Sequence, residues 1–141
     1  MNKDTRISDV LHVLLHMEKA KQPLTSEVLG RSMGTNPAVL RRTMAGLRDA
    51  GLVYSGNGRG GGWKLALPLS QITLLSVYEA LGKPNFFAIG NRSRHPECSV
   101  EKNVNLVLAD AIKAAESLLV ARFGEITLEA IDPHHSNTPE A

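Results

Sequence analysis

Two neighbouring arginines near the start of a predicted helix offer the clearest chemistry in this sequence. Asn36-Pro37 combines a good N-cap with a proline suited to the first helical turn, and Arg41 and Arg42 follow. An arginine can donate two hydrogen bonds to guanine O6 and N7, and a helix N-terminus favours phosphate. We therefore take Ala38, Arg41 and Arg42 as candidate DNA contacts. The alternative for the arginines alone is an ordinary solvated basic face.

A glycine-rich segment, residues 56–62, lies between two short predicted strands. Phosphate-binding loops of nucleotide-binding proteins are followed by a helix, whereas this segment is followed by the strand-like residues 63–67. We therefore reject a nucleotide site and interpret the segment as the tip of a hairpin. Asn57, Arg59 and Gly60 are candidate contacts to the DNA backbone or to the minor groove, which attracts arginine. A hairpin tip that contacts nothing is the alternative.

Cys98 is the only cysteine, which excludes a disulfide within the chain. It begins a long predicted helix whose dipole favours a thiolate, and Arg94 and His95 are close in sequence. Cys98 is therefore a candidate sensor of oxidants or electrophiles, with an inert packing cysteine as the alternative. His12 and His16 lie four residues apart on one predicted helix, but no third ligand is evident, so we expect no metal site.

The charge distribution divides the chain more clearly than its formal net charge of +2. Residues 1–68 carry ten basic and five acidic residues, whereas residues 69–141 carry six basic and nine acidic ones. A basic first half suits a polyanion such as DNA. No apolar run approaches the roughly 20 residues of a membrane helix, and no secretory signal is evident, so we expect a cytoplasmic protein. The sequence also shows no catalytic triad or paired-carboxylate motif, so we expect no enzyme.

Apolar spacing predicts three helices followed by a hairpin in the first half of the chain. The first helix covers about residues 5–20, and a short second helix is capped by Thr25 and ended by Gly34. The third runs from Asn36 to Gly51. Strands at 52–55 and 63–67 follow. This is the order of a winged helix-turn-helix domain, in which Thr25 and Ser26 are candidate phosphate contacts. The third helix is predicted to turn inward the side chains of Val39, Leu40, Met44 and Leu47, and outward those at 38, 41, 42, 45, 46 and 49.

The second half of the chain contains two further predicted helices. One begins at Ser70 and ends at Gly82, and a long one runs from about Ser99 to Phe123 and is closed by Gly124. The long helix carries two adjacent apolar stripes, which indicates two partners: its own domain, and the same helix of a second subunit. The first stripe consists of Val100, Val104, Val107, Ala111, Ala114, Leu118 and Ala121, and the second of Leu108, Ile112, Ala115 and Leu119.

The predicted fold is mostly α with a small β-hairpin. We divide it into a winged helix-turn-helix domain (1–82), a loop that carries Cys98 (83–98), a dimerisation helix with a short terminal helix (99–131), and a polar, disordered tail (132–141).

Several motifs together resemble the Rrf2 family of bacterial winged-helix transcription regulators. They are Leu47-Arg48-x-x-Gly51-Leu52-Val53, Gly60-Gly61-Gly62-Trp63-x-Leu65 and Ile72-Thr73-Leu74, with Leu40 before them. The similarity extends over about residues 5–131. It implies a homodimer that is joined through the long C-terminal helix and binds a partly palindromic operator. The family includes an iron–sulfur cluster regulator and a nitric-oxide-sensing repressor.

The sequence also departs from this family's pattern. Cluster-binding members have three cysteines before the dimer helix, and this chain keeps only the last, Cys98. Because iron–sulfur clusters prefer thiolate ligands, we expect none. In the hairpin, Asn57 stands where the family often has an arginine, and Arg59 stands where it usually has a proline, so any minor-groove contact is shifted or weakened.

The interpretation that follows is a homodimeric, DNA-binding transcription regulator of the Rrf2 type, acting as a repressor on double-stranded DNA, with Cys98 as a possible redox switch. One alternative is a winged-helix module for protein interaction or dimerisation without DNA binding. Another is a small-molecule-sensing regulator with a pocket around Tyr78, Phe86, Phe87 and Cys98.

Overall fold

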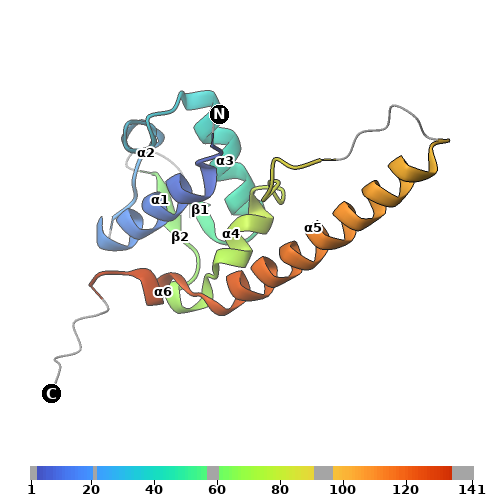
Figure 1. Ribbon diagram of the computed structural model, residues 1–141. Coiled ribbons are helices and arrows are strands. Elements are labelled where there is room, and N and C mark those ends of the chain that lie inside the picture. The colour runs from blue at the N-terminus through green and yellow to red at the C-terminus, as the bar shows by residue number, and fades with distance from the viewer. Residues whose placement is uncertain (1–2, 21, 57–60, 91–96, 135–141) are drawn as a thin grey trace, which may run out of the picture.

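The computed structural model describes residues 3–20, 22–56, 61–90 and 97–134 (Figure 1). Within these ranges, helices predominate and the two strands form one antiparallel hairpin. In chain order the elements are α1 (Arg6–Ala20), α2 (Ser26–Met33), α3 (Pro37–Asp49), β1 (Val53–Ser55), β2 (Trp63–Leu65), the 3-10 helix η1 (Leu69–Gln71), α4 (Leu74–Ala80), α5 (Ser99–Glu125) and α6 (Leu128–Ile131).

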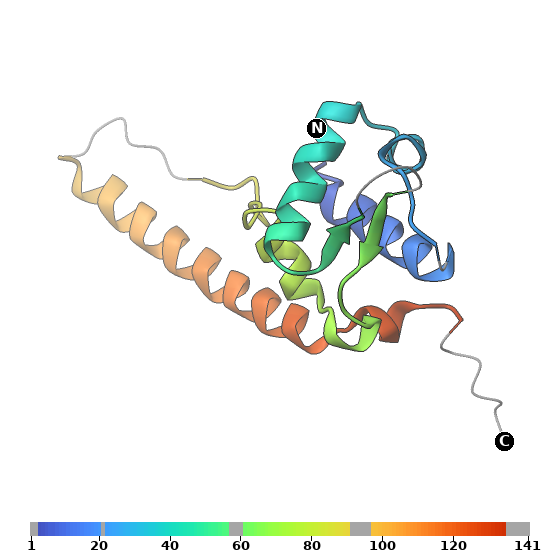
Figure 2. The ribbon, with the colours of Figure 1, turned by 180° about the vertical axis from the view of Figure 1, so that it is seen from behind.

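A single apolar core holds α1, α2, α3 and the hairpin together. Figure 2 shows the two strands lying between α3 and α1. Leu14, Leu40 and Leu47 are completely buried, and burying a leucine side chain stabilises the fold by about 1.5–3 kcal/mol. The chain's C-terminal region also enters this core, because Leu128 of α6 is completely buried in the same cluster.

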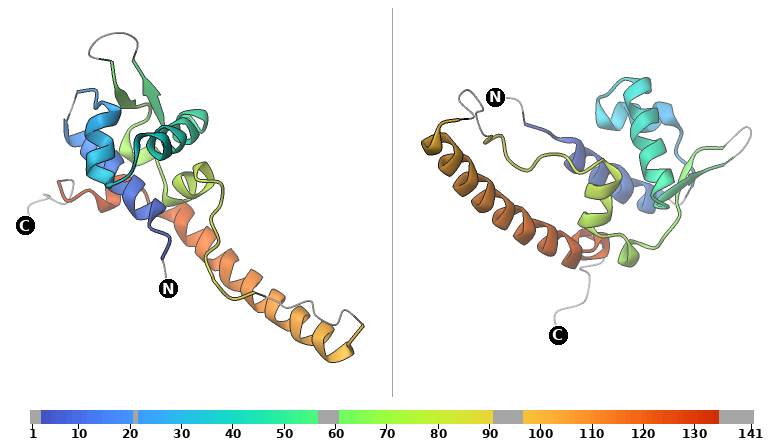
Figure 3. Two further views of the ribbon diagram at one scale, coloured as in Figure 1. Left: turned by 90° about the horizontal axis from the view of Figure 1, so that it is seen from above. Right: turned by 90° about the vertical axis from the view of Figure 1, so that its right-hand side faces the viewer.

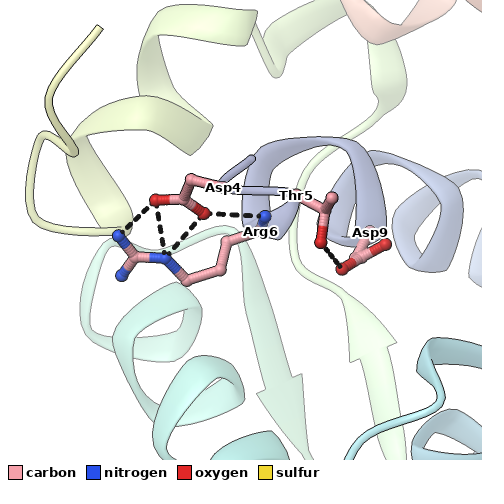
Figure 4. A network of polar contacts seen from close by, with 4 residues as sticks. All are labelled: Asp4, Thr5, Arg6 and Asp9. Atoms are coloured by element: carbon pink, nitrogen blue, oxygen red, sulfur yellow. Dashed lines mark hydrogen bonds and ion pairs between the residues drawn. The ribbon is translucent and has the colours of Figure 1, made fainter. Parts of the chain in front are cut away.

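The start of α1 is fixed by short-range polar contacts (Figure 4). Arg6 donates from Nη2 to Asp4 Oδ2 at 2.7 Å and from Nε to both carboxylate oxygens. Between these two residues, Thr5 donates from Oγ1 to Oδ2 of Asp9, one turn further along the chain, at 2.9 Å. The side-chain hydrogen bonds from Arg6 lower the pKa of the Asp4 carboxyl below its ordinary value.

The hairpin is shorter than predicted and is joined by a third segment. Val53 pairs with Leu65 and Ser55 with Trp63, so each strand has three residues rather than four or five. Leu24, just before α2, forms an antiparallel bridge to Trp63, with backbone N–O distances of 3.1 and 2.8 Å. The entrance to α2 is thereby held against β2.

The helix that was predicted to begin at Ser70 begins at Leu74 instead. Thr73 is its N-cap: Thr73 Oγ1 accepts from Ser76 N, and Ser76 Oγ accepts from Thr73 N. Ile72 is extended because its carbonyl accepts from Leu128 N at 2.8 Å, while Leu74 N donates to Ile126 O at 3.0 Å. This pairing with a segment more than fifty residues away ends η1 and shifts the helix start.

Helix α5 extends far beyond the body of the molecule, and its N-terminal end points away from the hairpin (Figure 3). The prediction that Gly124 closes it is wrong, because the helix continues to Glu125. A Cβ on Gly124 would lie 3.4 Å from Leu75 Cδ2, so this glycine marks the close approach of α5 to α4. Among the described residues, no helix is both long and apolar enough to span a membrane.

The two predicted stripes of α5 have different environments. In the second stripe, Ile112, Ala115 and Leu119 are half-buried. The first stripe is exposed along its whole length: Val100 is 68%, Val107 68% and Leu118 74% accessible. No residue of α5 is fully buried. From Ile112 onward the second stripe therefore faces the chain's own domain, whereas its first member, Leu108, is 37% exposed, and the first stripe is left open.

Candidate nucleic-acid interface

Helices α2 and α3 form a helix-turn-helix joined by a three-residue turn. Gly34, with φ of 61°, ends α2 in the left-handed conformation that glycine adopts at no steric cost. Asn36 caps α3 by accepting from Val39 N at 2.9 Å, and Pro37 occupies the first turn. Both caps follow from local sequence, and both predicted boundaries are confirmed. The turn brings the N-terminal half of α3 to the surface.

The exposed side of α3 carries two arginines that form no ion pair with any residue the structure describes. Leu40, Met44 and Leu47 are buried on the opposite side. Ala38, Arg41 and Arg42 are exposed, as predicted. Within the described part of the chain neither arginine forms an ion pair, whereas Arg48 near the helix end contacts Asp49 at 3.4 Å. Two unpaired guanidinium groups thus lie on the first two turns of α3.

Two details of the predicted α3 faces are wrong. Val39 was expected inside but is 41% exposed. At 3.6 residues per turn it lies about 100° from Leu40, outside the stripe that Leu40, Met44 and Leu47 define. Ala45 and Gly46 were expected to face solvent but are half-buried, and a Cβ on Gly46 would lie 3.0 Å from Ala80 O. Val39 therefore joins the exposed surface, while Gly46 supports the crossing of α3 and α4.

Residues at the start of α2 are held by the hairpin. Thr25 is the N-cap, and its Oγ1 accepts from Val28 N at 3.3 Å. Trp63 Nε1 donates to Ser26 Oγ at 3.2 Å, across 37 residues of sequence. An indole N–H can only donate, so the Ser26 hydroxyl accepts here and keeps its own hydrogen for another acceptor. Ser26 is thus a link between the hairpin and α2 as well as a candidate phosphate contact.

The base of the hairpin requires one of its glycines. A Cβ on Gly62 would lie 2.8 Å from Leu24 O, too close for any other residue without a backbone shift. Gly56 N donates to Gly62 O at 2.9 Å and continues the ladder toward the tip. The predicted contacts Asn57, Arg59 and Gly60 lie outside the described residues.

Several exposed residues of α2 and the hairpin were not predicted as contacts. Arg31 belongs to the lining of an open hollow of about 460 Å³ between the start of α2, the turn and Pro37. On the hairpin, Tyr54 pairs with Lys64, and both are exposed. Alternation along the strands could have identified Tyr54 and Lys64, since Val53 and Leu65 face the core.

The predicted sensing pocket is only partly assembled. Tyr78 and Phe86 stack at a centroid distance of 4.6 Å and belong to the lining of a cavity of about 310 Å³. Phe87 lies beside Phe86, at 6.4 Å, but does not line the cavity. Cys98 is the N-cap of α5, whereas Phe123, which contacts Tyr78, lies near its other end. At 1.5 Å per residue these positions are roughly 35 Å apart, so including Cys98 in this pocket was wrong.

Cys98 itself is exposed. Its side chain makes no capping hydrogen bond, and its carbonyl accepts from Lys102 N at 3.1 Å.

Comparison with known proteins agrees with this geometry. Residues 3–132 match the model of the Rrf2 family, described as iron-dependent transcriptional regulators. YwnA of Bacillus subtilis strain 168, named as an HTH-type transcriptional regulator, is 24% identical over 93% of this chain and 97% of its own. A crystal structure of a transcriptional regulator from Lactobacillus plantarum superposes with a TM-score of 0.75 at 22% identity, covering 94% of this chain and 91% of that one.

CymR of B. subtilis, described as the global cysteine regulator, superposes with a TM-score of 0.60 at 20% identity, covering 95% of this chain and 98% of that one. At such identities the structural matches establish the fold. The family match extends over nearly the whole chain, so the protein belongs to the Rrf2 family of winged helix-turn-helix transcription regulators. It is a regulator of transcription rather than an enzyme.

The family description raises the question of iron. Iron–sulfur clusters are held mainly by cysteine thiolates, and this chain has one cysteine. Within the described ranges, no three His, Cys, Asp or Glu side chains are grouped to hold a metal ion. His12 Nδ1 lies 2.9 Å from the Ser8 carbonyl of its own helix. The residues present do not fit an iron–sulfur cluster, and we assign no role to one.

Proposed function

We propose that this protein is a sequence-specific DNA-binding repressor that reads DNA with α3 and the hairpin. The observation that carries the proposal is the pair of exposed, unpaired arginines on the first turns of α3. In helix-turn-helix proteins the N-terminal residues of the second helix meet base edges in the major groove. Ala38, Arg41 and Arg42, with Val39 beside them, form the proposed base-reading surface.

Around this surface we propose a rim of phosphate and minor-groove contacts. Thr25 and Ser26 lie at the N-terminus of α2, where free N–H groups favour phosphate. Trp63 orients the Ser26 hydroxyl by occupying its acceptor side. Asn57, Arg59 and Gly60 are the proposed contacts from the hairpin tip. Because a bacterial regulator meets DNA in the cytoplasm, we also propose a cytoplasmic location.

Selection of bound duplexes from a random pool, followed by titration of the selected operator and of random DNA, tests the proposal. Arg42→Ala should weaken operator binding by about 1–3 kcal/mol and random DNA much less. Arg48→Ala is the matched control, because Arg48 lies on the same helix but pairs with Asp49. Equal losses on both duplexes would make Arg42 a phosphate contact and remove it from the base-reading surface.

We further propose a homodimer joined through the exposed stripe of α5. In the part of the chain that the structure describes, nothing covers the row of valines and alanines with Leu118 that forms the first stripe of the 27-residue α5. A second copy of the same stripe would cover it by a two-fold interface, and a two-fold dimer matches a partly palindromic operator. The proposed division into a reading domain (1–82) and a dimerisation region (99–131) rests on this arrangement.

We also propose that oxidation or alkylation of Cys98 switches DNA binding. Its exposure and its position at the N-terminus of α5 support access by a reagent and a favourable helix dipole. Peroxide, disulfide stress and electrophiles should each release DNA from the native protein but not from Cys98→Ser. If both proteins respond equally, Cys98 is not the switch.

A protein-interaction module without DNA binding predicts a different salt response. A protein that neutralises several phosphates loses affinity steeply between about 50 and 200 mM salt, because counterions are released. Failure to retain any duplex at low salt would favour the interaction module and overturn the DNA-binding proposal.

A further inference from the structure

The cavity between α4 and α5 is lined mainly by apolar, aromatic and acidic side chains, whereas the proposed base-reading surface of α3 carries two arginines. It measures about 310 Å³, within the size range of small-molecule sites, and is lined by residues of α4, α5 and the segment between them. Its apolar part consists of Leu75, Tyr78, Phe86 and Val120. Tyr78 is 8% exposed, and its stacking on Phe86 at an interplanar angle of 14° forms an aromatic wall.

The charged side chains around this wall are mainly acidic. Glu79 of α4 and Glu116 of α5 are lining residues, and among the described residues Lys83 is the one lining residue of opposite sign. None of the three forms an ion pair with any other residue that the structure describes. The surrounding half of the chain, residues 69–141, has three more acidic than basic residues.

We propose that this cavity binds a small organic cation, an amine carried on an apolar or aromatic body. Aromatic rings present a negative face that attracts cations and disfavours anions. Glu79 from α4 and Glu116 from α5 supply counter-charges, and Lys83 competes for them. The apolar lining suits a carbon body and does not suit a hydrated metal ion.

A ligand in this cavity would change DNA affinity through α5. A ligand here contacts α4, which belongs to the reading domain, and α5, which carries the proposed dimer stripe. In the proposed dimer, the angle between α4 and α5 sets the separation of the two α3 helices. A ligand that binds one angle more tightly than another therefore shifts the protein toward that angle and changes its affinity for the operator. This regulatory step rests on the proposed DNA-binding function, whereas binding of the cation does not.

The chain around Lys83 adds a local constraint. Gly82 and Lys83 are both left-handed, with φ of 81° and 56°, and Lys83 N donates to Tyr78 O at 3.1 Å. Lys83 is the only residue other than glycine with positive φ among those described. Asparagine tolerates this conformation better than most residues, so Lys83→Asn removes the competing charge without new backbone strain.

Binding is tested on the full-length, ¹⁵N-labelled protein without DNA, using 2-phenylethylamine, 2-phenylethanol and 3-phenylpropionate, three probes of similar size that differ in charge. The amine should shift the amides of residues 78–83 and 116–120 and bind more tightly than the other two. Glu116→Gln should weaken the amine about two- to fivefold, and Lys83→Asn should strengthen it by a similar factor. Glu18→Gln on α1 is the control and should leave the affinity unchanged.

Equal binding of the alcohol, tighter binding of the carboxylate, or the absence of shifts at these amides would overturn the proposal. The regulatory step is measured separately, as operator affinity with and without the amine at matched ionic strength. A change in the native protein that is reduced in Glu116→Gln supports it, and no change overturns it. Failure to bind DNA at all would instead overturn the proposed function and leave the NMR result to decide the cation site.

Discussion

Helix α3 buries a stripe of apolar side chains in the core, whereas helix α5 leaves its first apolar stripe exposed. Leu40 of α3 is completely buried against its own domain, whereas Leu118 of α5 is 74% exposed. The charges differ as well, with a basic excess in residues 1–68 and an acidic excess in residues 69–141. The comparison indicates that the apolar face of α3 is covered by its own chain, while the first stripe of α5 is left uncovered by the described residues, which is the basis of the proposed dimer.

The largest expected effect comes from the buried side of this comparison. Leu40→Ala should lower the free energy of unfolding by about 2–5 kcal/mol, because it removes packed methyl groups and leaves a cavity. Chemical denaturation followed by circular dichroism measures this. Leu106→Ala, at a 69% exposed position of α5, is the control and should change stability little. Similar losses in both variants would contradict the distinction.

The hairpin base should be the next most sensitive position. Gly62→Ala introduces a Cβ 2.8 Å from Leu24 O, and the strands must separate to accept it. We expect a loss of about 1–3 kcal/mol in unfolding free energy, typical of overpacking. Gly90→Ala is the control, since no described residue comes within 4 Å of its added Cβ. If Gly62→Ala is as stable as the native protein, the bridge to Leu24 is not required.

A charged residue introduced into the first stripe of α5 should weaken the proposed dimer without unfolding the protein. Leu118→Asp should raise the dimer dissociation constant at least tenfold, about 1.4 kcal/mol, while leaving the helical content intact. Analytical ultracentrifugation over a concentration series gives the constant. Lys113→Asp, outside the two stripes on the same helix, serves as the comparison. An unchanged sedimentation profile for Leu118→Asp would show that the stripe is not the interface.

A smaller effect is expected from the contact that joins the hairpin to α2. Trp63→Phe keeps an aromatic ring but removes the donor to Ser26 Oγ, which should cost about 0.5–1.5 kcal/mol. The double variant with Ser26→Ala should then be less than additive, because both changes remove the same hydrogen bond. Additive losses in denaturation would indicate that the two residues act separately.

The smallest effect concerns the exposed start of α1. Hydrogen bonds from Arg6 lower the pKa of Asp4, so ionised Asp4 contributes stability above its unfolded pKa and loses it as the pH falls through the folded value. Arg6→Gln should raise the pKa of Asp4 toward its ordinary value, as an NMR titration of the carboxyl group would show. Arg122→Gln, at the far end of the chain, should leave it unchanged.

Local signals in the sequence predicted most of the reading domain. The caps at Thr25 and Asn36 act through hydrogen bonds to residues three positions away, so their effect can be read from neighbouring letters. The start of α4 could not be predicted in this way. Ser70 is a reasonable N-cap, but Ile72 and Leu74 are paired with the chain around Ile126, and that pairing depends on the path of α5.

The sequence by itself determined the kinds of element, their order, the charge division and the single thiol, because these depend on composition and short-range periodicity. Tertiary structure decided what several residues do. Gly46, Gly62 and Gly124 lie where another segment approaches closely, and Ser26 meets Trp63 across 37 residues. Such contacts depend on the packing of distant segments, which periodicity does not encode. The same packing places Cys98 away from the aromatic cavity and leaves the first stripe of α5 exposed.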